Sequence, residues 1–278
     1  MSNKITLSCF VHTYNQSLFI KECLNSIFSQ KTKYKFEVII IDDCSTDNTK
    51  EVVESFRKEL KLDNLHFFST KKNTGLGKKA IQELGSKIKR FLNTEYIYRI
   101  DSDDYIIDDQ KFEKQISLLE ENPDVVGICH HYMLIEEENG NKTICNNSIT
   151  GTLSARELIK ILVFNSHTIY NHTSTYLYRN IHKSPLPPQF KKDWVKGDVL
   201  YNWSMLNHGK IYFTDDVMSA YRIHKNGIWN SIPKEKQRFL NERLVYKIFK
   251  VLSFKNKCYF IIFTIQNFFK KSKKCLNF

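Results

Sequence analysis

Three aspartates stand within four positions of this 278-residue sequence, at Asp101, Asp103 and Asp104, directly after a β-like run at residues 96–100. Like charges this close repel one another, so folding alone does not favour the arrangement. Because alternate side chains of a strand point the same way, Asp101 and Asp103 should share a face. Two such oxygen donors suit a Mg²⁺ or Mn²⁺ ion that keeps several waters and bridges a diphosphate. The alternative is a solvated acidic turn that caps the helix expected from Asp108 onward.

Two further polar clusters also follow apolar runs. Asp42 and Asp43 end the run "FEVIIIDD", and "HTYN", which begins at His12, ends the β-rich run at residues 5–11. A carboxylate such as Asp43 can accept a hydrogen bond from a base N–H or a ribose hydroxyl. The alternative for Asp43 is an anion at a helix N-terminus, stabilised by the helix dipole.

The elements that must position these clusters alternate in type. Strands are expected at residues 5–11, 36–41, 65–69 and 96–100, and helices at 17–30, 48–60 and 77–90. This alternation predicts a parallel sheet with helices on both faces. Ligands of such sheets bind beyond the carboxyl ends of the strands, so the three polar clusters should converge on one edge.

Beyond residue 110 the alternation loosens. The expected elements are a helix at 108–121, a strand at 125–135, a polar hairpin or loop at 136–147, helices at 154–164 and 198–207, and short strands at 210–214 and 217–223. No internal repeat is visible.

Composition limits the class of protein. A hydrophobic fraction of 41% suits a soluble globular chain, and 42 Lys and Arg against 30 Asp and Glu give a formal charge of +12. The excess implies an anionic partner: a nucleotide, a nucleic acid or a membrane surface. Seven scattered cysteines without a C-x-x-C pair indicate neither a disulfide framework nor a zinc site. Without a signal-peptide cleavage pattern, a reducing, cytoplasmic compartment is expected.

The run "SCFVHTYNQSLFIKECLNSIFSQ … FEVIIIDDCSTDNT … KNTGLGKKA … YIYRIDSDDYI" resembles the nucleotide-sugar half of the family 2 inverting glycosyltransferases. The match covers roughly the first 110 residues in order and at the family's spacing; each piece is weak alone, and the set is specific. His12 departs from the pattern, because the family more often has proline or a small residue there.

The resemblance implies an α/β fold of the GT-A (Rossmann-like) type, with a mostly parallel sheet, helices on both faces and a C-terminal helical extension. It divides the chain into a nucleotide-sugar-binding half (residues 1–110), an acceptor-binding half (111–232) and basic amphipathic helices (233–278).

The second half, "WVKGDVLYNWSMLNHGKIYFTDDVMSAYRIHKNGIW", resembles the members of that family that modify surface polysaccharides. Asp198 matches the family's catalytic base, and inverting transfer needs one carboxylate to take the proton of the acceptor hydroxyl. The alternative is that Asp198 caps the helix that follows it. In "YRIH", strand alternation puts Arg222 and His224 on one face, where they could meet the departing diphosphate or complete a metal shell.

These inferences assign three groups of residues. Asp198 is the expected base, and Asp103 and His224 are the expected ligands of Mn²⁺ or Mg²⁺. The expected donor-binding residues are His12, Thr13, Tyr14, Asp43, Asn73, Gly75, Arg99, Asp101, Ser102 and Arg222. Of these, Asn73 and Gly75 shape the loop "KKNTGLGKKA", which lacks the phosphate-loop pattern. His130, His131 and His172 have no partner at a suitable spacing and are expected to be structural.

The last stretch, residues 253–278, holds six lysines and no acidic residue. Its apolar core, Cys258–Ile265, is far shorter than the roughly 20 residues that a membrane span needs. Two alternatives stay open: a helix lying on an anionic membrane, peripheral to its inner face, or a helix packed against the catalytic domain or a partner in a homo-oligomer.

The expected function is transfer of a hexosyl or N-acetylhexosaminyl group from a nucleotide-diphosphate sugar to a glycan or lipid-linked acceptor, in the synthesis of O-antigen, capsule or lipooligosaccharide. UDP is the commonest nucleotide in the family. The alternatives are a nucleic-acid-binding protein and an inactive sugar-nucleotide-binding subunit. The basic residues are mostly dispersed and no nucleic-acid-binding signature is visible, so no nucleic-acid partner is expected. The presence of all three acidic elements argues against the inactive subunit.

Overall fold

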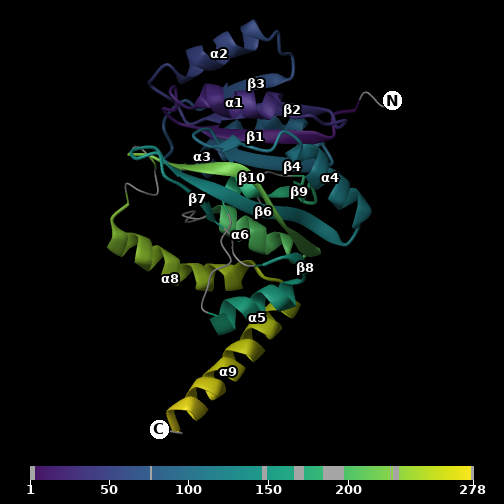
Figure 1. Cartoon of the computed structure of the whole chain (residues 1–278), viewed down its shortest axis with the longest axis vertical. Helices are drawn as coiled ribbons and strands as arrows, with labels where there is room; N and C mark the ends of the chain where they lie inside the picture. Colours follow the sequence, from purple (N-terminus) through teal and green to yellow (C-terminus); the bar gives the residue numbers. More distant parts are fainter. Residues whose placement is uncertain are drawn as a thin grey trace.

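A computed structural model describes residues 4–75, 77–145, 149–165, 172–183, 197–225, 227 and 232–276. Its centre is a ten-stranded sheet in the order β3-β2-β1-β4-β9-β6-β10-β5, with β7 paired to β6 and β8 paired to β10 (Figure 1). The strands are β1 (Leu7–Thr13), β2 (Phe36–Asp42), β3 (Leu65–Ser69), β4 (Tyr96–Asp101), β5 (Tyr105–Ile106), β6 (Val125–Glu136), β7 (Lys142–Cys145), β8 (Gly151–Leu153), β9 (Leu177–Arg179) and β10 (Lys210–Ile223).

Parallel pairs join β3, β2, β1 and β4 in one half of the sheet and β6 with β10 in the other. The short strand β9 runs antiparallel between β4 and β6 and connects the two halves. The expected α/β fold with a mostly parallel sheet is therefore confirmed, and the sheet continues across residue 110 because β5 pairs with β10.

Both faces of β2 are buried, which explains its near-continuous apolar run. Val38 and Ile40 pack with residues of three helices on one face, and Ile39 and Ile41 pack with a fourth helix on the other. All four side chains are 1% exposed or less. The first three helices are α1 (Ile20–Phe28), α2 (Thr49–Glu59) and α4 (Lys111–Glu121), and the fourth is α3 (Gly77–Ile88), which continues into the 3₁₀ turn η1 (Lys89–Leu92).

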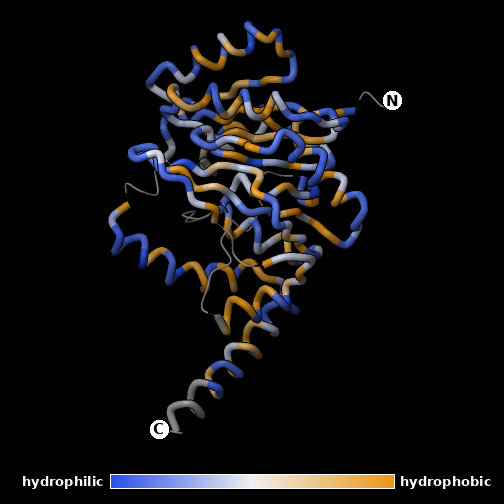
Figure 2. Tube along the Cα trace, viewed as in Figure 1, coloured by the Kyte–Doolittle hydropathy of each residue, from blue (hydrophilic) through white to orange (hydrophobic). Residues whose placement is uncertain are grey.

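A separate core lies beneath the second half of the sheet. It joins buried residues of β6 and β10 to four helices, which Figure 1 shows below the sheet. These are α5 (Ala155–Asn165), α6 (Gly197–Met205), α8 (Lys234–Val251) and, through Phe263, α9 (Phe254–Leu276). The 3₁₀ turn η2 (Thr173–Thr175) precedes β9. Figure 2 shows the apolar segments gathered between these layers.

The C-terminal helix α9 (Phe254–Leu276) packs beside α5 and then extends away from the rest of the chain (Figure 1). Among the helices that the structure describes, none is long and apolar enough to cross a membrane.

The polar segment after β6 is a hairpin that includes β7, which is one of the two alternatives expected there. Two details differ from the elements expected from the sequence. The two short strands at 210–214 and 217–223 form one strand, β10, whose pairing with β6 shifts register near Phe213 and Val217. The two- and three-residue strands β5, β8 and β9 were not expected, because so short a segment carries no alternation of its own.

Candidate active site

The carboxyl ends of β1, β2 and β4 meet at one edge of the sheet, as expected. The register pairs Thr13 with Asp42 and His12 with Asp101. Beyond the strands, the amide of Asp43 donates to the carbonyl of Thr13 at 3.0 Å, and the amide of Ser102 donates to the carbonyl of His12 at 2.9 Å. The three polar clusters therefore lie side by side.

The Asp43 carboxylate holds the loop that precedes α3. Its Oδ1 accepts the amide of Thr74 at 2.9 Å and its Oδ2 accepts the amide of Gly75 at 3.0 Å. The amide of Gly75 also donates to Oδ1 of Asn73 at 2.7 Å. Gly75 has a φ of +69°, a left-handed conformation that glycine adopts without strain. Asn73 and Gly75 thus shape the loop, and Asp43 holds it against the end of β2.

The turn after β1 is locked to the turn after β2. Asn15 takes a φ of +52°, and its Oδ1 accepts the amide of Thr46 at 2.7 Å. Tyr14, the residue before it, is 37% exposed, so its ring is open to solvent at this edge.

Asp101 and Asp104 are buried carboxyl groups close to other negative charges. Burial, and then the negative charges of Asp103 and Asp198, raise the pKa of Asp101 to about 7, while Arg99 opposes the shift. Burial, and then Asp103 and Asp101, raise the pKa of Asp104 well above its usual range. Asp104 is held by the amide of Arg222, which donates to its Oδ1 at 3.0 Å.

Asp103, in the turn after β4, contacts His224, which directly follows β10. Oδ2 of Asp103 lies 3.0 Å from Nε2 of His224, and the His224 ring packs against Phe19 with centroids 4.7 Å apart. His224 is 7% exposed. This carboxylate–imidazole pair is the one expected from the sequence to hold a divalent cation.

Arg222 holds the aspartate turn in place. Its Nε donates to the carbonyl of Asp103 at 2.8 Å, and its guanidinium pairs with Glu22 and Glu137. The guanidinium also lies 4.7 Å above the ring of Phe19. The charge of Arg222, which was expected to meet the donor, is thus shared with two carboxylates of the protein.

His172 lies at this site, although the sequence indicated a structural role. Its Nδ1 is 3.4 Å from Oδ2 of Asp104, and its ring stacks on Tyr221 with centroids 4.2 Å apart. Burial lowers the pKa of His172 to about 4, partly opposed by Asp198 and Asp103. In the part of the chain that the structure describes, Asp101, Asp104 and His172 form a group with one potential ligand atom each within 4.8 Å of one another. No local pattern could have indicated His172, because its partners come from the turn after β4 and from β10.

Asp198 is the second residue of α6 and lies at the same edge. Oγ1 of Thr173 donates to its Oδ2 at 3.4 Å, and its charge contributes to the pKa shifts of Asp101 and His172. The expected base therefore lies near the aspartate turn, and a place in the first turn of a helix also suits its charge.

Arg99 and His12 line the site between β1 and β4. The Arg99 guanidinium lies 4.0 Å above the ring of Tyr201 and is 7% exposed. Burial, and then Arg99, lower the pKa of His12 to about 4. Among the described residues, Nδ1 of His12, Oγ1 of Thr13 and Oγ of Ser102 are buried without a hydrogen-bond partner. Buried polar groups normally have partners, so three such atoms at one edge are what a ligand would satisfy.

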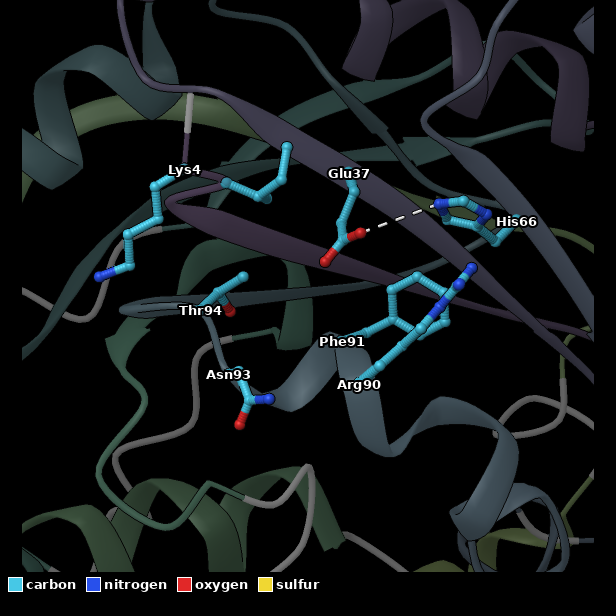
Figure 3. A pocket seen from close by; sticks show the side chains of 8 residues that line it. Lys4, Glu37, His66, Arg90, Phe91, Asn93 and Thr94 are labelled. Carbon is cyan, nitrogen blue, oxygen red and sulfur yellow. Dashed lines mark ion pairs between the residues drawn. The ribbon is translucent and has the colours of Figure 1, made fainter. Parts of the chain in front are cut away.

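A depression of about 520 Å³ lies at the opposite edge of the sheet, near the starts of β2 and β3 (Figure 3). Glu37 and His66 point toward one another there, with 3.8 Å between Oε2 and Nε2. Oγ of Ser8 donates to Oε1 of Glu37 at 3.0 Å. None of the expected site residues lines this depression, so it is not the site of the chemistry described above.

The family model for glycosyl transferase family 2 matches residues 8–183, well over half of the chain. The chain belongs to this family. The match includes all three polar clusters and ends before Asp198. The membership of family 2 that the resemblance implied is thereby confirmed.

Two curated relatives and two solved structures extend the comparison. An uncharacterised protein of Mycobacterium tuberculosis is 26% identical over 244 residues, covering 83% of this chain and 62% of that protein. The poly(ribitol-phosphate) beta-N-acetylglucosaminyltransferase TarS of Staphylococcus aureus is 30% identical over 173 residues, covering 62% of this chain and 27% of that protein. The chain thus spans less than two thirds of these relatives.

The structures agree in fold. TarS 1–349 in complex with UDP-GlcNAc superposes with a TM-score of 0.67 at 21% identity, covering 95% of this chain and 71% of that one. The mannosyltransferase PcManGT of Pyrobaculum calidifontis, in complex with GDP-Man and Mn²⁺, superposes with a TM-score of 0.58 at 16% identity. The match covers 88% of this chain and 63% of that one. The glycosyltransferase fold of the chain is therefore of the GT-A type.

Proposed function

We propose that this chain transfers a hexosyl or N-acetylhexosaminyl group from a UDP-sugar to a glycan or lipid-linked saccharide, with inversion, during synthesis of a surface polysaccharide in the cytoplasm. The observation that carries the proposal is that Thr173, which donates to Asp198, directly follows His172, whose Nδ1 lies 3.4 Å from Oδ2 of Asp104 in the aspartate turn. Asp198 is thereby placed near the edge of the sheet at which β2 ends with Asp42. One site would then contain a base, candidate metal ligands, and buried polar atoms without a partner that a nucleotide could satisfy.

The nucleotide would lie over the ends of β1 and β2. Thr13, Tyr14 and Asp43, with the loop shaped by Asn73 and Gly75, are proposed to contact the base and ribose. His12, Arg99, Asp101 and Ser102 are proposed to contact the ribose and diphosphate, and the buried Nδ1 of His12 and Oγ of Ser102 support this. Arg222 contributes by holding the carbonyl of Asp103 and the carboxylate of Asp104.

The residues at the aspartate turn suit a divalent cation. Asp103 and His224 offer a carboxylate oxygen and an imidazole nitrogen 3.0 Å apart. Burial, and then neighbouring carboxylates, raise the pKa values of Asp101 and Asp104, so a cation at this turn would be favourable. We propose that Asp103 and His224 hold Mn²⁺ or Mg²⁺. When bound, the ion supplies a Lewis acid for the charge that develops on the diphosphate.

Asp198 is proposed to act on the acceptor. Its carboxylate takes the proton of the acceptor hydroxyl as that oxygen forms a bond to the anomeric carbon. The bond from the anomeric carbon to the diphosphate oxygen breaks on the opposite side, and its electron pair leaves with UDP. The hydrogen bond from Thr173 would orient the carboxylate.

Two of the relatives support a UDP-sugar as donor and a surface glycan as acceptor. TarS acts on poly(ribitol-phosphate) with N-acetylglucosamine, and its structure was obtained with UDP-GlcNAc. The complex of PcManGT with GDP-Man and Mn²⁺ makes GDP-sugars the second donors to test.

The test is nucleotide release by the purified chain with UDP-, GDP- and dTDP-sugars, Mn²⁺, and free or lipid-linked saccharides. We expect release of UDP that depends on acceptor, a β-linked product from an α-linked donor, and thermal stabilisation by UDP with Mn²⁺. Binding of UDP without turnover for any acceptor would instead indicate an inactive binding subunit. Stabilisation by duplex DNA and not by UDP would support the nucleic-acid-binding alternative.

A further inference from the structure

The helix α9 has one face that packs on α5. Phe263 is 7% exposed, and its ring meets that of Phe164 with centroids 6.2 Å apart. Nδ2 of Asn267 donates to the carbonyl of Val163 at 2.8 Å. Of the two alternatives that the sequence left open, packing against the catalytic domain therefore describes this inner face of α9.

The outer face of α9 is apolar and exposed. We call its residues the α9 stripe: Phe254 (84% exposed), Ile261 (48%), Ile262 (47%), Ile265 (51%), Phe268 (67%) and Phe269 (60%). From Ile261 onward these positions recur at three- and four-residue steps, so they lie along one side of the helix. Figure 1 shows α9 running out past α5, and Figure 2 shows apolar segments along it. A contiguous apolar patch of this kind marks an interaction site.

All the charged side chains of the segment that carries the stripe are lysines. Residues 253–278 contain six lysines and no aspartate or glutamate. Lys255, next to the first residue of the stripe, is exposed. On the preceding helix, α8, exposed Phe239 and Tyr246 lie under Arg243 and Lys250, at 4.7 and 4.5 Å. Both C-terminal helices thus present aromatic rings beside cations.

We propose that the α9 stripe docks on the surface of an anionic lipid bilayer, with α9 lying along the interface. At about 1.5 Å per residue the 23-residue helix is about 35 Å long, and no described helix could cross the bilayer. Isoleucine and phenylalanine side chains enter the boundary between headgroups and acyl chains, while lysines meet anionic headgroups.

The charge favours this occupant over a second copy of the chain. Two α9 stripes packed together would bring two sets of lysines close to one another without an acidic residue between residues 253 and 278 to neutralise them. In an anionic bilayer, the headgroups neutralise the lysines and the acyl chains beneath them receive the apolar side chains. The proposal does not depend on the identity of the sugar or on catalysis.

The experiment is co-sedimentation of the full chain with vesicles of phosphatidylcholine alone or mixed with phosphatidylglycerol. We expect roughly tenfold more protein to pellet with the anionic vesicles, and less as salt is raised, because salt screens the lysines. The double variant Ile261→Ser/Ile265→Ser should lose this binding. Gln266→Ser, also in the exposed part of α9 but outside the stripe, is the matched control and should keep it. Circular dichroism and thermal unfolding show that each variant is folded.

Three outcomes would overturn the proposal. The first is equal binding to neutral and anionic vesicles, or no binding to either. The second is a double variant that binds as the unmodified chain does. The third is self-association of the unmodified chain, measured by analytical ultracentrifugation, that the double variant abolishes; the stripe would then be an interface between copies. Glycosyl transfer to a soluble acceptor should be unchanged in the double variant.

Discussion

Nε2 of His224 lies 3.0 Å from Oδ2 of Asp103, although the two residues are 121 positions apart. One follows β10 and the other follows β4, two strands that are not neighbours in the sheet. The contact is supported from both sides, because Phe19 packs on the His224 ring and Arg222 holds the carbonyl of Asp103. A divalent cation would thus find two ligands already in place.

This pair predicts which histidine controls the response to metal. His224→Gln should raise the Mn²⁺ concentration for half-maximal activity by about tenfold or more, because loss of a ligand or its support weakens metal binding by roughly that factor. Asp103→Asn should abolish metal-dependent UDP binding while the fold survives. The measurements are a Mn²⁺ titration of activity and calorimetry with UDP.

His172→Gln separates the two candidate metal groups. If Asp103 and His224 hold the ion, His172→Gln leaves the Mn²⁺ requirement within about twofold of the unmodified value. If Asp101, Asp104 and His172 hold it, the effects of the two histidine variants are exchanged. His66→Gln, at the opposite edge of the sheet, is the control and should change neither quantity.

The sequence predicted the strands and helices of the first half of the fold because its signals there are local. A strand buried on both faces, such as β2, reads as a continuous apolar run, and a polar cluster after it predicts a ligand edge. His172 could not be predicted this way, since its neighbours are Asp104 in the turn after β4 and Tyr221 in β10, which are both far from it in the sequence. The same holds for Arg222, whose partners Glu22 and Glu137 are set by tertiary packing alone.

Asp198→Asn tests the proposed base. The turnover number should fall by about 10²- to 10⁴-fold with little change in the affinity for UDP, because the carboxylate acts on the acceptor in the transition state. Thr173→Val removes one hydrogen bond to Asp198 and should lower turnover by a smaller factor. If UDP binding is lost together with activity, Asp198 is a structural helix residue. A product that retains the anomeric configuration would exclude the inverting mechanism.

The variant Gly75→Ala tests the loop that Asp43 holds. Gly75 has a φ of +69°, and an added Cβ would meet Oδ1 of Asn73 only at 3.9 Å, so the cost of Gly75→Ala comes from the backbone alone. We expect a loss of about 1–2 kcal/mol in the free energy of unfolding and weaker binding of UDP.

Gly85→Ala is the matched control for that change. Gly85 lies in α3 with nothing within 4 Å of an added Cβ, so alanine should stabilise the helix by roughly 0.5–1 kcal/mol and leave UDP binding unchanged. Denaturant unfolding and calorimetry measure the two quantities. If Gly75→Ala binds UDP as tightly as the unmodified chain, the loop does not contribute to the donor site.

A buried lysine–histidine pair away from the site predicts how stability depends on pH. Lys111 is fully buried, and its Nζ lies 2.8 Å from Nε2 of His130. Burial, and then Lys111, lower the pKa of His130 well below its usual value. His130 therefore stays neutral in the folded protein, whereas in the unfolded chain it takes up a proton below pH of about 6.5.

Folding then loses stability as the pH falls below that value, because the unfolded state binds the additional proton. The contribution of His130 should be fully present above a pH of about 7.5 and should decrease by up to about 1.4 kcal/mol per pH unit below about 6.5. In His130→Gln, whose amide oxygen can still accept from Lys111, the decrease in the free energy of unfolding from neutral to acidic pH should be smaller. Urea unfolding of both proteins at several pH values measures the difference, and His66→Gln shows how much a partly buried histidine contributes. An unchanged pH profile in His130→Gln would mean that His130 is protonated in the folded state, with its positive charge beside Lys111 compensated by other groups.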